Sequence, residues 1–188
     1  MAISDHVKNA QAHMEKAVDH LRQELRGIRT GRASPGLVEG VRVEVASYGS
    51  TMTVKELAGI AVAEGNVLVI KPFDPTTLKD IERGIEKSEL GINPQSDGKV
   101  LRLPVPPLSG ERRNQLTTRV KQLAEAQKVA VRNVRRDVKK ALDNEQKAKT
   151  LTEDEAKRGD ELVQKVTDEM IKRIDALVEE KTRDIMEG

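Results

Sequence analysis

Basic residues recur at helical spacing between Lys121 and Asp143, in the segment KQLAEAQKVAVRNVRRDVKKALD. At about 100° per residue, its basic side chains fall within an arc of roughly 100°, so they would form one ridge along a helix. Such a row of guanidinium and ammonium groups can bind the phosphates of a nucleic-acid backbone without base-specific contacts. This basic ridge consists of Lys121, Lys128, Arg132, Arg135, Arg136 and Lys139.

The same ridge also fits a second interpretation, a solvated helix face with no ligand. Val131, Val134 and Val138 fall in the neighbouring arc, which is wide enough to bury one side of the helix. Glu125 and Asp143 interrupt only the edges of the ridge. Periodicity alone therefore leaves ligand binding and simple solvation equally open.

Three histidines suggest metal chemistry at first sight. His6, His13 and His20 follow one another at seven-residue steps. On a helix this step separates neighbouring side chains by about 10 Å, which is too far for one ion to bind two of them. We expect these histidines at the surface, beside the apolar seam of their helix, and we predict no metal site.

A catalytic site is equally hard to find. The segment from Gly91 to Lys99 has six residues between its glycines and Val100 where a phosphate loop needs Ser or Thr. Acids such as Glu153 and Asp154 lie near the start of a predicted helix, where its dipole accounts for them. We predict that the protein is not an enzyme and uses no cofactor.

Composition narrows the partners and the compartment. The 188 residues include one Tyr, one Phe, no Trp and no Cys, with a net charge of +2. Without aromatic platforms, any nucleic-acid contact would be to backbone and shape. The lack of Cys favours a reducing compartment, and no segment resembles a signal peptide or a membrane span. We expect a soluble cytoplasmic protein that does not bind membranes.

Three long helices must position these residues. Val7, Met14, Leu21 and Ile28 recur every seven residues and predict a helix that ends near Arg29. A second helix restarts near Ser109 and carries the basic ridge. Apolar spacing from Val163 to Ile185 predicts a third, which Thr152 and Glu155 begin with a capping box. These helices would pack as a slender bundle.

The pattern changes completely between the first and second helices. Val41–Val45, Val67–Ile70 and Val100–Leu103 have strand character, and a short helix begins at Thr76 or Thr77. We therefore predict an α+β protein with a small β/α/β domain inserted into a three-helix bundle. The bundle would comprise 1–30 and 106–188, and the inserted domain 31–105.

Two connections link the predicted domains, RTGRASPG outward and PVPPLSGERR on return. Glycine loosens the first, and prolines stiffen the second. We predict paired hinges near 30–35 and 104–108, formed by Thr30, Gly31, Pro104, Pro106 and Pro107.

Three motifs, IRTGRASPGLVEG, SELGINPQSDGKVLRLPVPPLSGERR and KVAVRNVRRD, occur in the order and at the spacing typical of one family. They span nearly the whole chain, which resembles bacterial ribosome recycling factors. The resemblance implies the same three-helix bundle and inserted β/α/β domain, as an L-shaped two-domain protein. Three departures stand out: about two extra residues before Tyr48, Thr53 where a proline is common, and Gly110 where an acid is usual.

The resemblance also implies a function. Such factors bind the large ribosomal subunit after termination and, with elongation factor G and GTP, dissociate the post-termination complex. The expected partners are ribosomal RNA and elongation factor G, with no DNA and no membrane, and the chain would be a monomer. Matched motifs and the ridge give the expected RNA contacts: Arg29, Arg32, Arg132, Arg135, Arg136 and Lys128. Arg132 and Arg135 rank first.

Two other classes of protein remain open on the residues alone. The seven-residue repeats would also suit a structural coiled coil or adaptor whose helices assemble between chains. An enzyme with an unrecognised site is the third possibility, although no nucleophile and base are paired. Sedimentation with large subunits would separate the first class from the second.

Overall fold

The computed structural model describes residues 3–64 and 66–188 and has an α+β fold. The chain forms two compact units. One, the helical unit, combines Met1–Leu25 with Thr117–Arg183, and the other, the sheet unit, combines Arg26–Leu116 with Asp184–Gly188. No helix within the described ranges is long and apolar enough to span a membrane.

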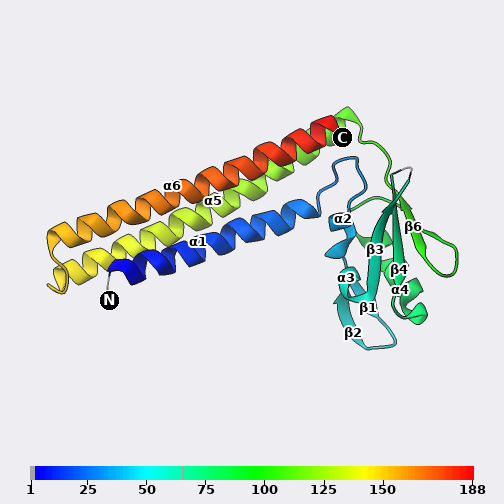
Figure 1. The fold of residues 1–188 in the computed structure, drawn as a ribbon, viewed down its shortest axis with the longest axis horizontal. Helices are drawn as coiled ribbons and strands as arrows, with labels where there is room; N and C mark the ends of the chain where they lie inside the picture. The colour runs from blue at the N-terminus through cyan, green and yellow to red at the C-terminus, as the bar shows by residue number, and fades with distance from the viewer. Residues whose placement is uncertain (1–2, 65) are drawn as a thin grey trace. The chain divides into compact units, whose positions relative to one another are not determined.

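The helical unit contains most of three long helices, which lie side by side (Figure 1). They are α1 (Ile3–Arg26), α5 (Gly110–Lys147) and α6 (Glu153–Glu187). The predicted capping box at the start of α6 is confirmed, because Glu155 Oε2 accepts hydrogen bonds from the Thr152 backbone N–H and hydroxyl, each at 2.9 Å. The three predicted helices are therefore present, with ends within a few residues of those expected.

The apolar seam packs within this single chain. Met14 and Leu21 of α1 and Met170 and Ile174 of α6 are completely buried. The buried Thr167 hydroxyl lies 4.0 Å from the sulfur of Met14, which places the first halves of α1 and α6 against each other. The seven-residue repeat is thus used inside one bundle, as the predicted fold requires.

One histidine prediction is wrong. His6 is only 8% exposed, and its Nε2 lies 3.0 Å from Glu145 Oε1 on α5. His13 and His20 are exposed, as expected. Periodicity within α1 could not reveal that a neighbouring helix supplies His6 with a carboxylate partner.

The sheet unit contains shorter elements in a more complex order than predicted. Its strands form a two-stranded sheet, β1-β2, and a four-stranded antiparallel sheet in the order β3-β4-β6-β5. The strands are β1 (Arg42–Val45), β2 (Ser50–Thr53), β3 (Ala58–Ala63), β4 (Val67–Pro72), β5 (Gln95–Ser96) and β6 (Leu101–Pro104). The helices are α2 (Gly36–Glu39), α3 (Val54–Leu57), the 3-10 helix η1 (Pro75–Thr77) and α4 (Leu78–Lys87).

One hydrophobic core holds the sheet unit together. Leu68 and Ile70 of β4 and Leu103 of β6 are completely buried, and they cluster with Ile81 and Ile85 of α4. Strand alternation places these side chains on one face of the four-stranded sheet. That inner face is therefore covered, and the positions between point to the opposite, outer face.

Candidate nucleic-acid interface

The orientation of α5 is set by its start and by its buried face. The Ser109 hydroxyl accepts a hydrogen bond from the Arg112 N–H at 3.2 Å, so Ser109 caps the helix although Gly110 replaces the usual acid. Val120, Val131 and Leu142 are at most 1% exposed. Burial of this stripe turns the basic ridge to the side of the packed face, as predicted.

Half of the ridge is engaged with α6. Lys128 Nζ lies 2.6 Å from Asp175, and Lys139 Nζ lies 3.3 Å from Asp160. Arg135 donates to Gln164 Oε1 at 2.7 Å. We call Lys128, Arg135 and Lys139 the inner cations. Their charges help to join two helices, so they are less available to a ligand than the ridge pattern implies.

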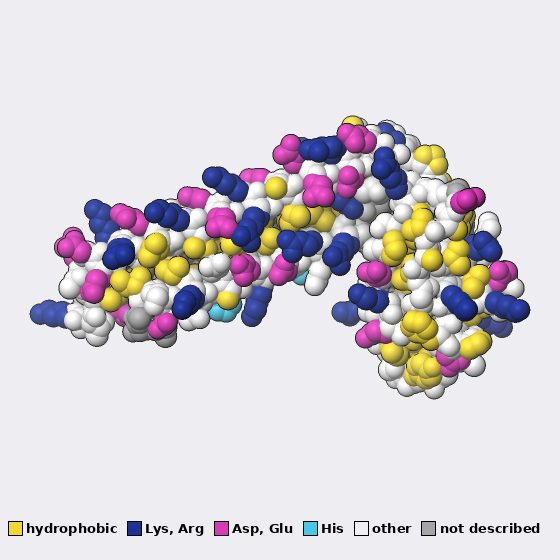
Figure 2. All heavy atoms as spheres, viewed as in Figure 1, with side chains coloured by type: hydrophobic (Ala, Val, Ile, Leu, Met, Phe, Trp, Pro, Cys, Tyr) yellow, Lys and Arg dark blue, Asp and Glu magenta, His cyan; other side chains and the backbone are white. Residues whose placement is uncertain are grey.

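Among the described residues, the other half of the ridge forms no hydrogen bond or ion pair with α6. Lys121 and Arg136 are exposed, and Arg132, 42% exposed at its side chain, forms an ion pair with Glu125 at 2.9 Å. We call Lys121, Arg132 and Arg136 the outer cations. Figure 2 shows that acids are interspersed with the cations along the helices, so the local charge is mixed.

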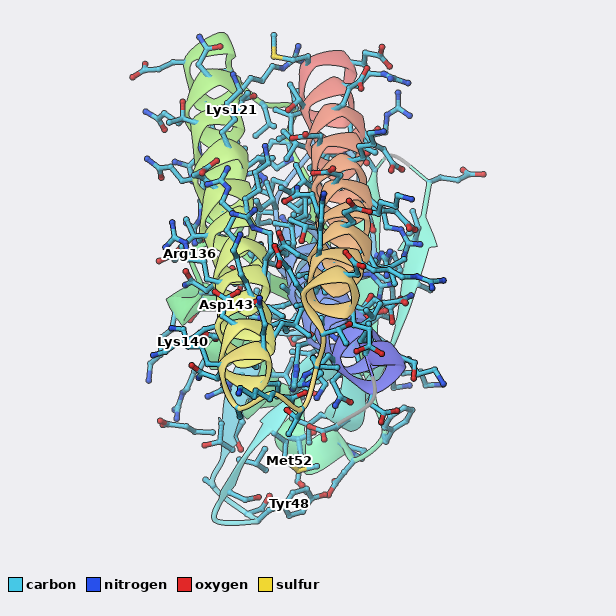
Figure 3. The ribbon with its side chains drawn as sticks, turned by 90° about the vertical axis from the view of Figure 1, so that its left-hand side faces the viewer. Tyr48, Met52, Lys121, Arg136, Lys140 and Asp143 are labelled. Carbon is cyan, nitrogen blue, oxygen red and sulfur yellow. The ribbon has the colours of Figure 1, made fainter. Side chains whose placement is uncertain are left out.

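Sequence reasoning omitted one further cation from this surface. Lys140 is exposed, and Figure 3 shows it and Arg136 extending from α5 on the side away from α6. On a helical wheel Lys140 lies about 80° from Arg132, just outside the arc that defined the ridge. A wider arc would have included it.

The two arginines of the first motif differ in accessibility. Arg32 is exposed, whereas Arg29 is partly buried and donates to the carbonyl oxygens of Leu90 at 3.2 Å and Pro106 at 2.9 Å. Burial lowers the pKa of Arg29 from its ordinary value, and the positive charge of Arg112 lowers it further. Arg29 is thus built into the sheet unit by its contact with the return connection.

Asn66 joins the two connections and was missed by sequence reasoning. Its amide Nδ2 donates to Gly31 O at 2.8 Å and to Val105 O at 2.7 Å, and its Oδ1 accepts from the Ala33 N–H. Its φ is 61°, a conformation that Asn adopts more readily than most residues. An Asn in the short connection between two strands was the available signal.

The predicted hinge residues lie at these same connections. Gly31 has a φ of 84°, and a Cβ there would stand 3.0 Å from the backbone carbon of Gly188. Thr30 precedes it, Pro104 ends β6, and Pro106 accepts the hydrogen bond from Arg29, with Pro107 next in the chain. Their role as hinges stays a prediction.

Comparison with known proteins matches this arrangement to one family. The sequence model described as "Ribosome recycling factor" matches residues 21–186. The ribosome-recycling factor of Symbiobacterium thermophilum is 46% identical over 181 residues, which are 96% of this chain and 97% of that protein. The factor of Staphylococcus haemolyticus is 45% identical over 184 residues, 98% of this chain and 99% of that protein.

Solved structures agree with these relatives. A solution structure of a ribosome recycling factor has a TM-score of 0.77 at 40% identity and covers 99% of this chain and 98% of its own. A second match has a TM-score of 0.68 at 38% identity, with 98% and 99% covered. It comes from models for the T. thermophilus ribosome recycling factor and the E. coli elongation factor G bound to the E. coli post-termination complex. The resemblance inferred from three motifs is confirmed, and the chain belongs to the ribosome recycling factor family.

Proposed function

We propose that the chain binds the large ribosomal subunit after translation termination. With elongation factor G and GTP, it then dissociates the post-termination complex so that ribosomes are reused. It acts as a monomer in the cytoplasm, hydrolyses nothing itself and needs no cofactor. Family membership supports this function, and the relative placed on a post-termination complex with elongation factor G supports the choice of partners.

The observation that carries the RNA contact is the row of outer cations on α5. Arg132 and Arg136 contact ribosomal RNA phosphates directly, and Lys128 and Arg135 add positive charge from the α6 side. Arg32 supplies a further exposed cation, while Arg29 contacts RNA only at an edge of its partly buried site. A guanidinium fork on a rigid helix suits this contact because it stays charged and binds phosphate oxygens in pairs.

The two-domain division and the hinges complete the proposal. Residues 1–30 and 106–188 act as a lever on the ribosome, and residues 31–105 move about hinges near 30–35 and 104–108. Long helices resist bending, so force from the GTPase passes along them to the contacts between subunits. Asn66 binds both connections, so the two connections would move together.

A splitting assay tests the function. Post-termination complexes receive the chain, elongation factor G and GTP, and subunit release is followed by light scattering. We expect release with the natural sequence and at least a tenfold lower rate for Arg132→Glu/Arg136→Glu, because reversed charges repel phosphate. Circular dichroism checks that this variant is folded.

The matched control reverses two exposed lysines of α6, Lys165→Glu/Lys172→Glu. It changes the net charge equally but leaves the basic ridge intact, so we expect it to split ribosomes at close to the natural rate. A folded Arg132→Glu/Arg136→Glu variant that works at full speed would exclude the ridge as the binding surface. No release with the natural sequence would exclude the function itself.

A further inference from the structure

The outer face of the four-stranded sheet is apolar and positively charged. Cross-strand pairing puts Ala61, Val69 and Arg102 in one row and Gly59 and Lys71 in the next. Leu68, Ile70 and Leu103 occupy the alternate positions and are buried in the core. The rows that contain Ala61 and Gly59 therefore face away from the core.

Phe73 stands at the end of this outer face. The Phe73 N–H donates to Leu57 O at 2.9 Å, so the pairing between β3 and β4 continues one position beyond β4. By alternation its side chain shares the face of Lys71 and Gly59, and its ring lies 3.9 Å from the site of a Cβ at Gly59. Phe73 is the one phenylalanine of the chain, yet it is 71% exposed. A ring of this size offers a partner a large apolar contact area beside Gly59.

The same face ends at an unpaired strand edge. Because Leu57 and Phe73 form a hydrogen-bonded pair, Gly59, Ala61 and Ala63 turn their backbone groups toward β4. Ile60 and Val62 must then turn theirs away from the sheet. Across the described part of the chain, no hydrogen bond of the protein reaches those outward groups.

This edge also lacks the usual protection against another strand. β3 has the sequence AGIAVA, without charge or proline, and Val62 is 54% exposed. Natural edge strands are commonly blocked by lysine, proline or a bulge, because an open edge readily pairs with another chain. The small side chains of Gly59 and Ala61 leave room for a partner beside Phe73.

Charge on the outer face selects the type of partner. Lys71 and Arg102 are exposed, and Arg102 Nε forms a long ion pair of 3.9 Å with Asp97 Oδ2. Asp97 also accepts hydrogen bonds from the N–H groups of its own loop. An acidic segment would complement this face. Phosphates of RNA would also match the cations, but only another strand brings N–H donors and carbonyl acceptors at the spacing of the edge.

We propose that β3 is a docking edge that receives an extended, acidic segment of a partner protein as a fifth strand. Phe73 packs against one side chain of that segment, and Lys71, on the adjacent strand β4, attracts its acids. This inference concerns a protein contact distinct from the ridge. It rests on the proposed function in one respect only: the partner protein is sought on the post-termination ribosome.

Photocrosslinking tests the docking edge. Phe73 is replaced by photoreactive p-benzoylphenylalanine, and the protein is bound to post-termination complexes with elongation factor G and irradiated. We expect a cross-link to an extended, acidic segment of a protein. The control places the same group at Glu86, an exposed position on α4, which covers the opposite face of the sheet. We expect at least fivefold less of that product there.

Two second-site variants decide whether the edge is used. Val62→Pro removes an outward N–H without touching the bonds to β4, and Lys71→Glu reverses one charge on a surface that tolerates it. Each should lower the cross-link at least fivefold while co-sedimentation with ribosomes through the ridge persists. If Val62→Pro disturbs folding, Lys71→Glu still gives the answer.

The outcomes separate this inference from the proposed function. Loss of co-sedimentation by the natural sequence would refute ribosome binding. Co-sedimentation without a protein cross-link would overturn the docking edge alone. A cross-link to RNA, a cross-link to a second copy of the chain, or full yield in Lys71→Glu would each overturn it as well.

Discussion

Arg135 donates a hydrogen bond from Nη1 to Oε1 of Gln164 at 2.7 Å and so joins α5 to α6. The amide of Gln164 in turn donates to Asp168 at 2.8 Å. Arg135 is therefore held between helices, whereas Arg136, the next residue, is exposed on the side away from α6 (Figure 3). The cations that form one ridge in the sequence therefore fall into two groups in the structure: the inner cations contact α6, and the outer cations do not.

The first prediction separates those groups by their response to salt. In Arg132→Gln/Arg136→Gln, two outer cations lose their charge, and each lost phosphate contact should reduce the salt dependence of binding by about 0.7–0.9 in a plot of log affinity against log salt concentration. We expect a slope lower by about 1.5, and weaker binding to the large subunit. Co-sedimentation at several salt concentrations gives the slope.

The matched control for this experiment is Lys128→Gln/Lys139→Gln, which removes the same charge from two inner cations. Because their ammonium groups lie against Asp175 and Asp160, we expect a smaller change in slope. Lys128 is partly buried, but Lys139 and both acids are exposed, and such surface ion pairs contribute about 0–1 kcal/mol each, so urea unfolding should shift only slightly. Equal slopes for the two double variants would contradict the division into outer and inner cations.

The second prediction concerns Asn66 and the two connections. Asn66→Asp keeps an acceptor for the Ala33 N–H but replaces the donor to Gly31 O and Val105 O with a carboxylate oxygen. Two lost hydrogen bonds, at about 1 kcal/mol each, and the new repulsion should destabilise the sheet unit by roughly 2–3 kcal/mol. Urea unfolding measures the loss, and hydrogen exchange at Ala33 and Val105 should be faster.

The control is Asn133→Asp, the same chemical change at an exposed position on α5. It should leave the stability of the sheet unit unchanged. Asn66→Gly separates the backbone conformation of the residue from its side-chain hydrogen bonds, because glycine accepts a φ of 61° but has no side-chain amide. If Asn66→Gly were as stable as the natural sequence, the three side-chain bonds of Asn66 would contribute nothing.

The bundle could be predicted from the sequence because each helix carries its own periodic signal over many turns. The seven-residue spacing of Met14 and Leu21, and the capping box of Thr152 and Glu155, are local patterns that the fold preserves. In the sheet unit, β1, β4 and β6 were predicted from local patterns too, because β1 and β6 alternate apolar and charged side chains and β4 begins with a run of branched apolar residues.

The remaining elements depend on partners distant in sequence. β3, with the sequence AGIAVA, has small residues and no alternation of apolar and polar side chains, and it forms only because β4 pairs with it. The ion pair of Lys128 with Asp175 and the burial of His6 against Glu145 likewise join different helices. A helical wheel for one segment contains no information about such neighbours, so it identified the ridge but could not divide it.

The third prediction tests close packing between α5 and α6. A Cβ at Gly159 would stand 2.9 Å from Leu142 Cδ1 and 3.4 Å from Ile3 Cγ2. Leu142 is 1% exposed and has little room to move. Overpacking costs about 1–3 kcal/mol, against a gain of about 1 kcal/mol from better helix propensity, so Gly159→Ala should destabilise the bundle by roughly 1 kcal/mol.

Urea unfolding followed by circular dichroism measures this change, and Gly110→Ala serves as control. Gly110 also lies in a helix, but nothing stands within 4 Å of its Cβ site. Alanine there should leave stability equal or slightly higher. Identical effects of the two substitutions would show that Leu142 relaxes without cost.

The fourth prediction uses the one tyrosine of a chain that has no tryptophan, so that ultraviolet absorbance reports its ionisation directly. The Tyr48 hydroxyl donates to Asp74 Oδ2 at 2.7 Å. This hydrogen bond, then desolvation and the charge of Asp74, raise the pKa of Tyr48 above its ordinary value of 10.0. The same bond lowers the pKa of Asp74, with help from the Thr76 N–H.

The directions of the two pKa shifts determine the pH range in which Tyr48 and Asp74 contribute to stability. Since the folded pKa of Tyr48 is raised, its contribution to stability is complete below the unfolded pKa and is lost as pH rises through the folded one. The lowered pKa of Asp74 works in the opposite direction, so its contribution is present above the unfolded pKa and is lost as pH falls through the folded one.

We expect Asp74→Asn, which removes the charge but can still accept a hydrogen bond, to lower the pKa of Tyr48 part of the way to its value in urea. Asp80→Asn is the control, because Asp80 bonds to the Ala46 N–H and not to Tyr48. A Tyr48 pKa that is the same in the native protein and in urea would mean that the bond to Asp74 does not form in solution.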